Sequence, residues 1–337
     1  MMQATSAASG AAWRWLTRGV ACLAIGLAGW LLWRTLGRYD PDQLRTAVAA
    51  IPLGRLLAAG GFAAASYLCL TGFDFLATRY VGKPLPYPRV ALASFTSLSL
   101  GHNIGLAALS SGAVRYRFYS RWGYATGDIA KLILFCALTV GLGLLVLAAA
   151  ALLLRADLAQ QVTGLGRGTV LALGIAAAAV ALLYLGLAAW LRRPLRLRSW
   201  SLQMPRLPLA LGQLVIGPLN FACVAACLHQ TLLGVADVPY LAVASVYVIA
   251  NVATLVTHVP GGLGVIESVV QYLLPQADLI GALLAFRFVY FLVPLALGAA
   301  SFGLCEVLLG RKPVAATASP SLGRNTSPAI CSRRKSS

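Results

Sequence analysis

Charged side chains inside apolar stretches are the residues of this sequence whose chemistry most needs a reason. Arg287 lies eight residues into the apolar run that begins at Leu279, which places it about 12 Å deep at 1.5 Å per residue. An ionised side chain at the bilayer centre costs about 2.5–3.5 kcal/mol on insertion scales. A guanidinium matches phosphate oxygens in bidentate geometry. Arg287 is therefore our best candidate for a phosphate contact, and Tyr290, one turn away, offers a hydroxyl.

Arg287 also has a structural interpretation. A buried guanidinium can be neutralised by a carboxylate such as Glu267, or by a carbonyl at the end of a short helix. The sequence leaves this alternative open.

A backbone break precedes Glu267. Pro260 and three glycines interrupt an apolar stretch. In hydrocarbon, each backbone group that this break leaves without a hydrogen bond would cost several kcal/mol, on the order of the cost of other buried polar groups. The flanking runs 242–256 and 265–274 are shorter than the roughly 20 residues of a span. This pattern predicts a re-entrant pair of short helices that lies within protein or along a wet cavity. The candidate binding glycines are Gly261, Gly262 and Gly264.

A second break interrupts residues 90–110 at Ser99–Gly105, and the segment ends just before Arg115. Helix N-termini carry roughly half a positive charge and free N–H groups. Those near Gly262 or Gly105 could hold a phosphate without a basic side chain. Asn103 and Gly105 are the candidate binding residues of this break.

Composition defines the class of protein. Of 337 residues, 59% are hydrophobic and 11% charged, with a mean hydropathy of +0.80, so we expect an all-α polytopic membrane protein. The 27 Lys and Arg are spread between apolar runs, which favours contact with anionic lipid and not with nucleic acid. The seven Cys and three His show no ligand spacing, and no nucleophile lies beside a base. We predict no metal, no cofactor and no enzymatic activity.

About eight apolar segments organise the chain. We expect a cytoplasmic N-terminal segment (1–18), a transmembrane domain (19–310) and a disordered basic tail (311–337). The domain would contain two broken segments, 90–110 and 239–275. The six continuous spans are 19–33, 56–77, 132–154, 169–191, 207–230 and 279–309.

An internal repeat relates the two halves. Pro88 and Pro239, 151 positions apart, each begin the pattern P-x-[V/L]-A-x-A-S, and the same shift superposes three early spans on later ones. The alternative is that short apolar sequence patterns recur by chance. If the breaks are re-entrant, the cytoplasmic parts hold 20 of the 27 Lys and Arg and the outer loops six. This predicts an inverted repeat, with halves of about 19–155 and 169–309, cytoplasmic termini, and Gly105 near Gly262 at the bilayer centre.

Opposite charges fall at equivalent positions of the repeat. Arg115 and Glu267 are 152 positions apart and each lies three residues after a Gly. They could pair with one another, bind the two signs of a lipid headgroup, or form structural ion pairs. Asp74, near the inner end of its span, could attract a cationic group or simply be solvated. We expect Glu306 to form a surface pair with Arg311 and Lys312.

Three motifs carry a family resemblance. Asn103–Arg115, Pro260–Glu267 (P-G-G-L-G-V-I-E) and Arg287–Pro294 (R-x-x-Y-x-x-x-P) resemble the membrane domain of the lysylphosphatidylglycerol synthase/flippase family, over about residues 15–309. The resemblance implies an inner-membrane domain that moves or exposes phospholipid, in some members lysyl- or alanyl-phosphatidylglycerol. The family's aminoacyltransferase domain has no counterpart here, so we expect no lipid aminoacylation.

The function we expect is a bacterial inner-membrane lipid translocase or lipid-exposing protein that acts on phospholipid headgroups. Its partners would be membrane phospholipids, anionic or aminoacylated. One alternative is a non-catalytic subunit that presents lipid to a separate aminoacyl- or glycosyltransferase. Another is a small-solute transporter with the same inverted architecture.

Overall fold

Membrane-length helices form most of the protein in a computed structural model, which describes residues 41–104, 107–191, 195–197, 200–257, 262, 264–274 and 279–309. Five stretches in this part are long and apolar enough to cross a membrane, which confirms the polytopic all-α prediction. The predicted span 19–33, the N-terminal segment and the tail from 311 lie outside the described residues. The five stretches are α3 (Leu53–Tyr80), α6 (Thr126–Leu154), α8 (Arg167–Trp190), α9 (Leu207–Leu232) and Ile280–Glu306.

Both broken segments fold as two packed helices. The second segment divides at its Pro and Gly residues, as predicted. For the first segment the predicted break is wrong in detail, because the helix continues through Ser99 to Ile104 and the following helix carries Arg115 in its middle. Ser and Gly residues do not stop a helix whose neighbours bury its faces. The pairs are α4 (Tyr87–Ile104) with α5 (Ala107–Arg121), and α10 (Tyr240–Thr257) with α11 (Val265–Leu273).

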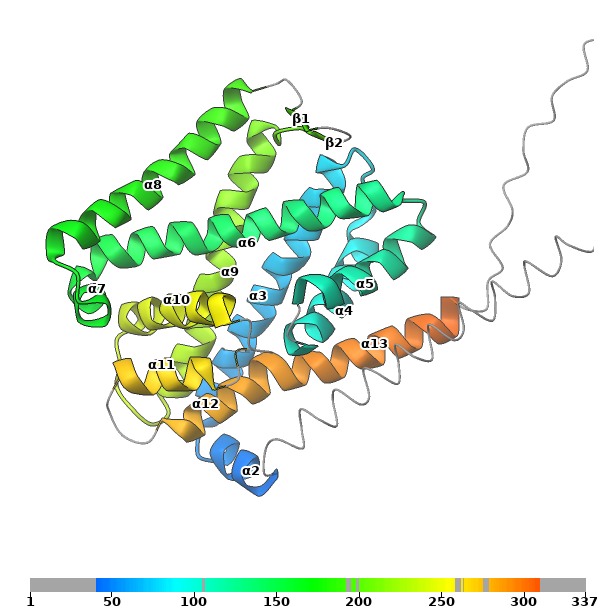
Figure 1. The fold of residues 1–337 in the computed structure, drawn as a ribbon. Coiled ribbons are helices and arrows are strands. Elements are labelled where there is room, and N and C mark those ends of the chain that lie inside the picture. The colour runs from blue at the N-terminus through cyan, green and yellow to red at the C-terminus, as the bar shows by residue number, and fades with distance from the viewer. Residues whose placement is uncertain are drawn as a thin grey trace, which may run out of the picture.

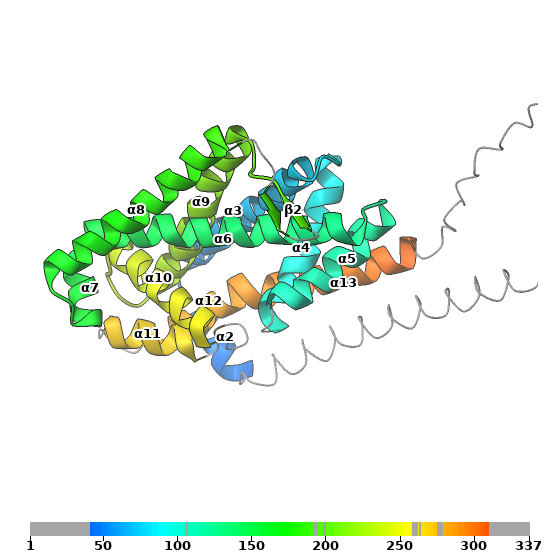
Figure 2. The ribbon, with the colours of Figure 1, turned by 45° about the horizontal axis from the view of Figure 1, so that its top comes forward.

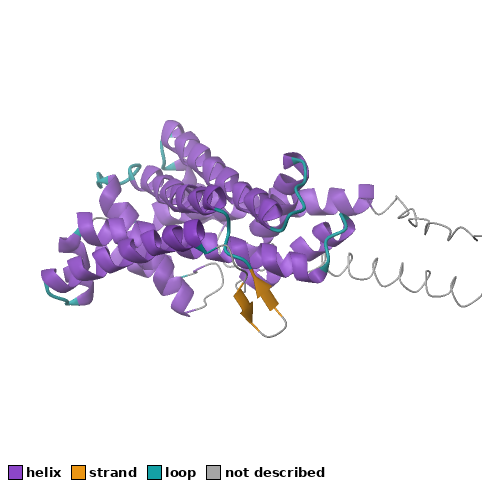
Figure 3. Cartoon of the chain, turned by 90° about the horizontal axis from the view of Figure 1, so that it is seen from above, coloured by secondary structure: helices purple, strands orange, loops and turns teal. Residues whose placement is uncertain are grey.

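Short elements occupy three connections that the sequence leaves as loops. A helix precedes α3, another follows α6, and two strands pair as an antiparallel hairpin between α8 and α9, seen in orange in Figure 3. They are α2 (Pro41–Ala49), α7 (Ala156–Thr163), β1 (Leu195–Leu197) and β2 (Trp200–Leu202).

Helices α3 and α9 form the most extensive helix contact and lie at the centre of the molecule. The pair α4–α5 lies on one side of them and α10–α11 on the other, in both ribbon views (Figures 1 and 2). Helix α4 packs on α3 and on α13 (Val293–Leu309), whereas α10 packs on α9 and on α6. Each helix pair is therefore held between a central helix and a long outer one.

Close backbone contact fixes α6 against α9. A Cβ built on Gly143 would lie 2.6 Å from the carbonyl carbon of Gly217, so no side chain fits between them. Gln213 adds a buried link, because its Nε2 donates to Thr139 Oγ1 at 2.8 Å and its Oε1 accepts from Tyr184 at 2.5 Å. These bonds tie α9 to α6 and α8.

The last span contains one wide turn. Its segments are α12 (Ile280–Arg287), the π-helical η2 (Phe288–Leu292) and α13 (Val293–Leu309). Pro294 lacks an N–H and its ring crowds the carbonyl four residues earlier, at Tyr290. The helix accommodates this by widening just before the proline. Arg287 and Tyr290 lie next to and within this turn, so the proline of the R-x-x-Y-x-x-x-P motif shapes the backbone that carries the other two residues.

Candidate functional site

The first buried ion pair joins α5 to α3. Arg115 donates to both carboxylate oxygens of Asp74, from Nε at 2.9 Å and from Nη2 at 2.8 Å. The carboxylate also accepts from Ser94 at 2.6 Å and from Tyr119 at 3.3 Å. Asp74 is fully buried and Arg115 is 3% exposed. The pair is therefore enclosed and bidentate, the geometry in which a buried guanidinium is best compensated.

Local helix geometry brings these groups together. Ser111 and Arg115 are four residues apart, so they lie on the same face of α5, and Arg115 Nη1 donates to the Ser111 hydroxyl at 3.1 Å. The solvated interpretation of Asp74 is wrong. Its position near the end of an apolar run suggests the interface, but α4 and α5 cover that part of α3.

A second, partly buried ion pair joins α12 to α11. Arg287 donates from Nε to Glu267 Oε1 at 2.7 Å and from Nη2 to Glu267 Oε2 at 3.0 Å. Its Nη2 also donates to the carbonyl of Gly262 at 2.7 Å, and its guanidinium lies 4.8 Å from the centre of the Phe291 ring. Arg287 thus has both partners of the structural interpretation, a carboxylate and a carbonyl of the break. The contacts of that interpretation are therefore present, and the phosphate contact of Arg287 stays a prediction.

Glycine is needed at two points beside this pair. Gly262 has φ +59° and Gly264 has φ +80°, in the left-handed region that side chains disfavour. Gly264 begins the turn into α11, and its N–H donates to Glu267 Oε2 at 2.9 Å. The N-terminus of α11, considered above as a phosphate site, thus already holds a carboxylate of the same helix.

The candidate charges do not pair across the repeat. Arg115 bonds to Asp74, and Glu267 bonds to Arg287. The surface pair predicted for Glu306 is also wrong, because its carboxylate accepts from Arg117 and Arg121 of α5 and its side chain is only 7% exposed. The side chain of Asn103 and all of Gly105 and Gly261 lie outside the described residues, so the predicted approach of Gly105 to Gly262 stays a prediction.

Polar side chains lie between the two ion pairs, in the core formed by α3, α9 and η2. The hydroxyl of Ser66 donates to Asn220 Oδ1 at 2.7 Å and is 3.0 Å from the hydroxyl of Tyr290. All three residues are buried. The candidate Tyr290 is therefore fixed to the two central helices through one serine.

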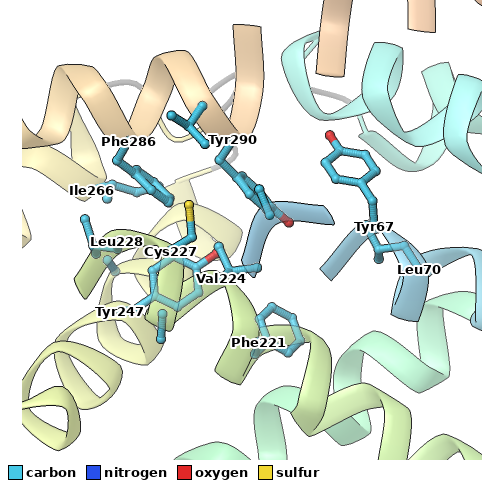
Figure 4. Packing of buried hydrophobic residues seen from close by; sticks show 14 of the residues in the cluster. Tyr67, Leu70, Phe221, Val224, Cys227, Leu228, Tyr247, Ile266, Phe286 and Tyr290 are labelled. Carbon is cyan, nitrogen blue, oxygen red and sulfur yellow. The ribbon is translucent and has the colours of Figure 1, made fainter. Parts of the chain in front are cut away.

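Two further tyrosines extend this group toward each ion pair. The ring of Tyr67 on α3 lies 5.7 Å from that of Tyr290 and 6.3 Å from that of His102 on α4, the helix that packs on the α5 of Arg115. On the other side, the ring of Tyr247 of α10 lies 6.5 Å from that of Phe286, which stacks on Tyr290 at 5.7 Å. Figure 4 shows Tyr247 and Tyr290 beside Val224 of α9, whereas the Tyr67 side chain points away from that helix. Phe291 links Tyr290 to Arg287, because its ring lies 5.2 Å from that of Tyr290 and 4.8 Å from the guanidinium. We call the following set the polar row: Arg115, His102, Tyr67, Tyr290, Tyr247 and Arg287.

The sequence analysis named three of the six residues of the polar row and missed His102, Tyr67 and Tyr247, together with the supporting residues Ser66, Asn220 and Ser111. Asn220 and Ser66 had a usable signal, because a polar residue inside an apolar span needs a partner. Ser111 could have been found from its four-residue spacing to Arg115. Tyr67 gives no such signal, since tyrosine is common in membrane helices and its partners come from other elements.

The side chains of the polar row are better suited to binding a ligand than to catalysing a reaction. The charges of the row are compensated by fixed ion pairs and its remaining groups are hydroxyls, an amide and an imidazole. In the part of the chain that the structure describes, no three His, Cys, Asp or Glu side chains gather as metal ligands. These groups can hold a polar ligand by hydrogen bonds inside an apolar protein.

The fold and this buried polar core define a polytopic helical membrane protein whose spans enclose compensated charge. Residues 21–298 match the family described as the lysylphosphatidylglycerol synthase TM region, and the chain belongs to that family. It is 31% identical to the uncharacterized protein slr0712 of Synechocystis over 283 residues, which is 82% of this chain and 87% of the relative. It is 30% identical to the inner membrane protein YbhN of Escherichia coli over 260 residues, 74% of this chain and 80% of the relative. The suspected family is thereby confirmed.

Proposed function

We propose that this protein moves or exposes the headgroups of phospholipids in a bacterial inner membrane. The observation that carries the proposal is the polar row, which extends from the buried pair of Arg115 to the partly buried pair of Arg287 through the core of a protein otherwise built from apolar helices. Buried ion pairs are a weak source of stability, because hydrophobic residues of similar volume often do as well. A polar core of this extent is better explained by a polar ligand that meets it.

The family match and the relative named as an inner membrane protein support the location. We further propose that α4–α5 and α10–α11 are re-entrant pairs that enter from opposite sides, in repeat halves of about 19–155 and 169–309 with both termini in the cytoplasm. The exchanged packing supports this, since α4 contacts the last span of the second half and α10 contacts the last span of the first. Central α3 and α9 would then be equivalent helices.

Opposite charges at equivalent places support binding of a dipolar or charged headgroup. In the proposed repeat Arg115 and Glu267 correspond, yet each pairs with a different neighbour, Asp74 and Arg287 respectively. The two halves therefore present different electrostatics to a common core. A headgroup that passes between them would meet paired charges and hydroxyls while its acyl chains stay in lipid.

Lipid movement in vesicles tests the proposal. The full chain is reconstituted with fluorescent phosphatidylglycerol, phosphatidylethanolamine and phosphatidylcholine, and the fraction that dithionite quenches from outside is measured over time. We expect faster exchange than in protein-free vesicles, and a loss of at least tenfold in rate for Tyr290→Ala. The matched control is Tyr272→Ala, which removes a 79% exposed tyrosine of α11.

The outcome separates the alternatives. Absence of movement for every headgroup, beside a scramblase that works in the same vesicles, would overturn the translocase. Dependence of a separate transferase on this protein would then favour the non-catalytic subunit. Uptake of water-soluble solutes would favour the small-solute transporter.

A further inference from the structure

Two polar atoms in the middle of the polar row have no hydrogen-bond partner among the described residues. The hydroxyl of Tyr67 and Nδ1 of His102 are both buried, and Tyr67 as a whole is 6% exposed. Buried polar groups in native proteins are paired in the great majority of cases. A lone unpaired group costs about 1–3 kcal/mol, so two in adjacent rings need an explanation.

The two groups lie side by side on facing helices. Their rings are 6.3 Å apart between centres, and Phe95, seven residues before His102 on the same face of α4, packs edge-on against Tyr67 at 5.3 Å. Tyr290 lies against the other side of the Tyr67 ring, with its own hydroxyl already bonded to Ser66. Figure 4 shows the Tyr67 hydroxyl pointing away from α9. The unpaired atoms therefore belong to the α3–α4 side of the core.

The chemistry of the surroundings favours an anionic oxygen. A phenol hydroxyl donates, and Nδ1 of His102 donates in one of its two tautomers. The carboxylate of Asp74 already accepts from Arg115, Ser94 and Tyr119, so its charge is compensated within that cluster. An oxygen that carries charge accepts several short hydrogen bonds from such neutral donors.

We propose that Tyr67 and His102 form a subsite that binds a phosphate group. This deepens the lipid function proposed above and rests on it only for the source of the phosphate. A phosphodiester of a lipid headgroup and free inorganic phosphate share the chemistry that the two donors recognise.

Ligand titrations of the purified full chain in detergent test the subsite. The probes are dioctanoyl phosphatidylglycerol, dioctanoylglycerol with the same chains and no phosphate, and inorganic phosphate. Affinity is measured by calorimetry, and the shift in melting temperature is followed in parallel. We expect Tyr67→Phe and His102→Phe each to weaken binding of the phosphatidylglycerol roughly tenfold to a hundredfold, the usual effect of losing a hydrogen bond to a charged group.

The chain offers a matched control in Thr96→Val. Thr96 Oγ1 is also buried without a partner, but it is six residues before His102 and so on another face of α4. All three variants remove an unpaired polar atom, so the ligand-free protein should melt at the same or a higher temperature in each case. Only the variants at Tyr67 and His102 should lose affinity.

Each outcome has a consequence. Equal affinity for dioctanoylglycerol, or unchanged affinity in Tyr67→Phe and His102→Phe, would overturn the subsite. Binding of inorganic phosphate with the same dependence on Tyr67 supports the chemistry and assigns it to free phosphate. If lipid moves in vesicles but these variants bind as the wild type does, the subsite fails and the proposed function stands. If Tyr67→Phe and His102→Phe lose binding while the wild type moves no lipid, the subsite stands and the proposed function fails.

Discussion

The two buried ion pairs of this protein are alike in geometry and different in surroundings. Asp74 and Arg115 have side chains that are 0% and 4% exposed, and Ser94, Ser111 and Tyr119 complete their hydrogen bonds. In the other pair the Glu267 side chain is 24% exposed, and its partner also holds a carbonyl of a break in the helix. The first pair is a closed connection between two helices. The second lies where a backbone carbonyl and a partly exposed carboxylate meet, so it is the more open of the two pairs.

The largest expected effect is at the closed pair. Asp74→Asn leaves the guanidinium of Arg115 in the core without its counter-charge, and breaking a buried pair in this way costs about 3–5 kcal/mol. We expect little folded protein, measured as the monodisperse fraction in detergent and the melting temperature. A double variant, Asp74→Leu with Arg115→Met, removes both charges and should recover most of the loss. A stable single variant would show that the pair is not closed.

A smaller effect is expected at the open pair. Glu267→Gln removes one charge, but Arg287 keeps the Gly262 carbonyl and the amide can still accept a bond. The expected loss is about 1–3 kcal/mol, the penalty of imperfect pairing at a partly exposed site. Thermal unfolding beside Asp74→Asn measures the difference. A loss as large as that of Asp74→Asn would remove the distinction between the pairs.

The loss of stability should be smaller still at Tyr290, which lies between the two ion pairs. Tyr290→Phe removes one hydroxyl, and Ser66 retains its bond to Asn220. A single neutral hydrogen bond contributes about 0.5–1.5 kcal/mol, so we expect a shift of a few degrees in melting temperature. Val289→Ile, at a buried apolar position one residue earlier, controls for repacking of the wide turn. Complete unfolding would mean that the Tyr290 hydroxyl supports more than its bond to Ser66.

An exposed pair gives the lower limit of this scale. Lys83 and Asp128 are 2.7 Å apart with side chains 47% and 24% exposed. Lys83→Met should cost about 0–1 kcal/mol, and the effect should fade in 1 M salt because the ions are screened. The melting-temperature shifts of Asp74→Asn and Glu267→Gln should persist in the same salt. If they also disappear, both pairs are reached by the solvent.

Sequence reasoning found the elements better than the contacts. Apolar length predicts α3, α6, α8, α9 and the last span, because burying about 20 residues in lipid is decided locally. Pro and Gly predict the break before Glu267 for the same reason. Ser99–Ile104 shows the limit, since weak helix breakers were overruled by packing against neighbouring helices.

The site was predicted in part. Arg115, Glu267 and Arg287 follow from the cost of burying charge, which applies whatever the fold. The partner of Arg115 does not follow, because Asp74 is 41 residues away and the helical period fixes a face of a helix and not what lies opposite. Tyr67 and His102 were missed for the same reason, because their role in the site depends on a contact between α3 and α4.

The position of Glu267 has a consequence for how the chain is made. It precedes Arg287 by 20 residues, so the carboxylate has left the ribosome before the guanidinium during synthesis. The last span, whose mean hydropathy reaches 2.1, then enters the membrane with the charge of Arg287 after the carboxylate of Glu267 has been synthesised. A nascent chain that carries Glu267→Ala should insert its last span less efficiently, even where the finished protein tolerates the change.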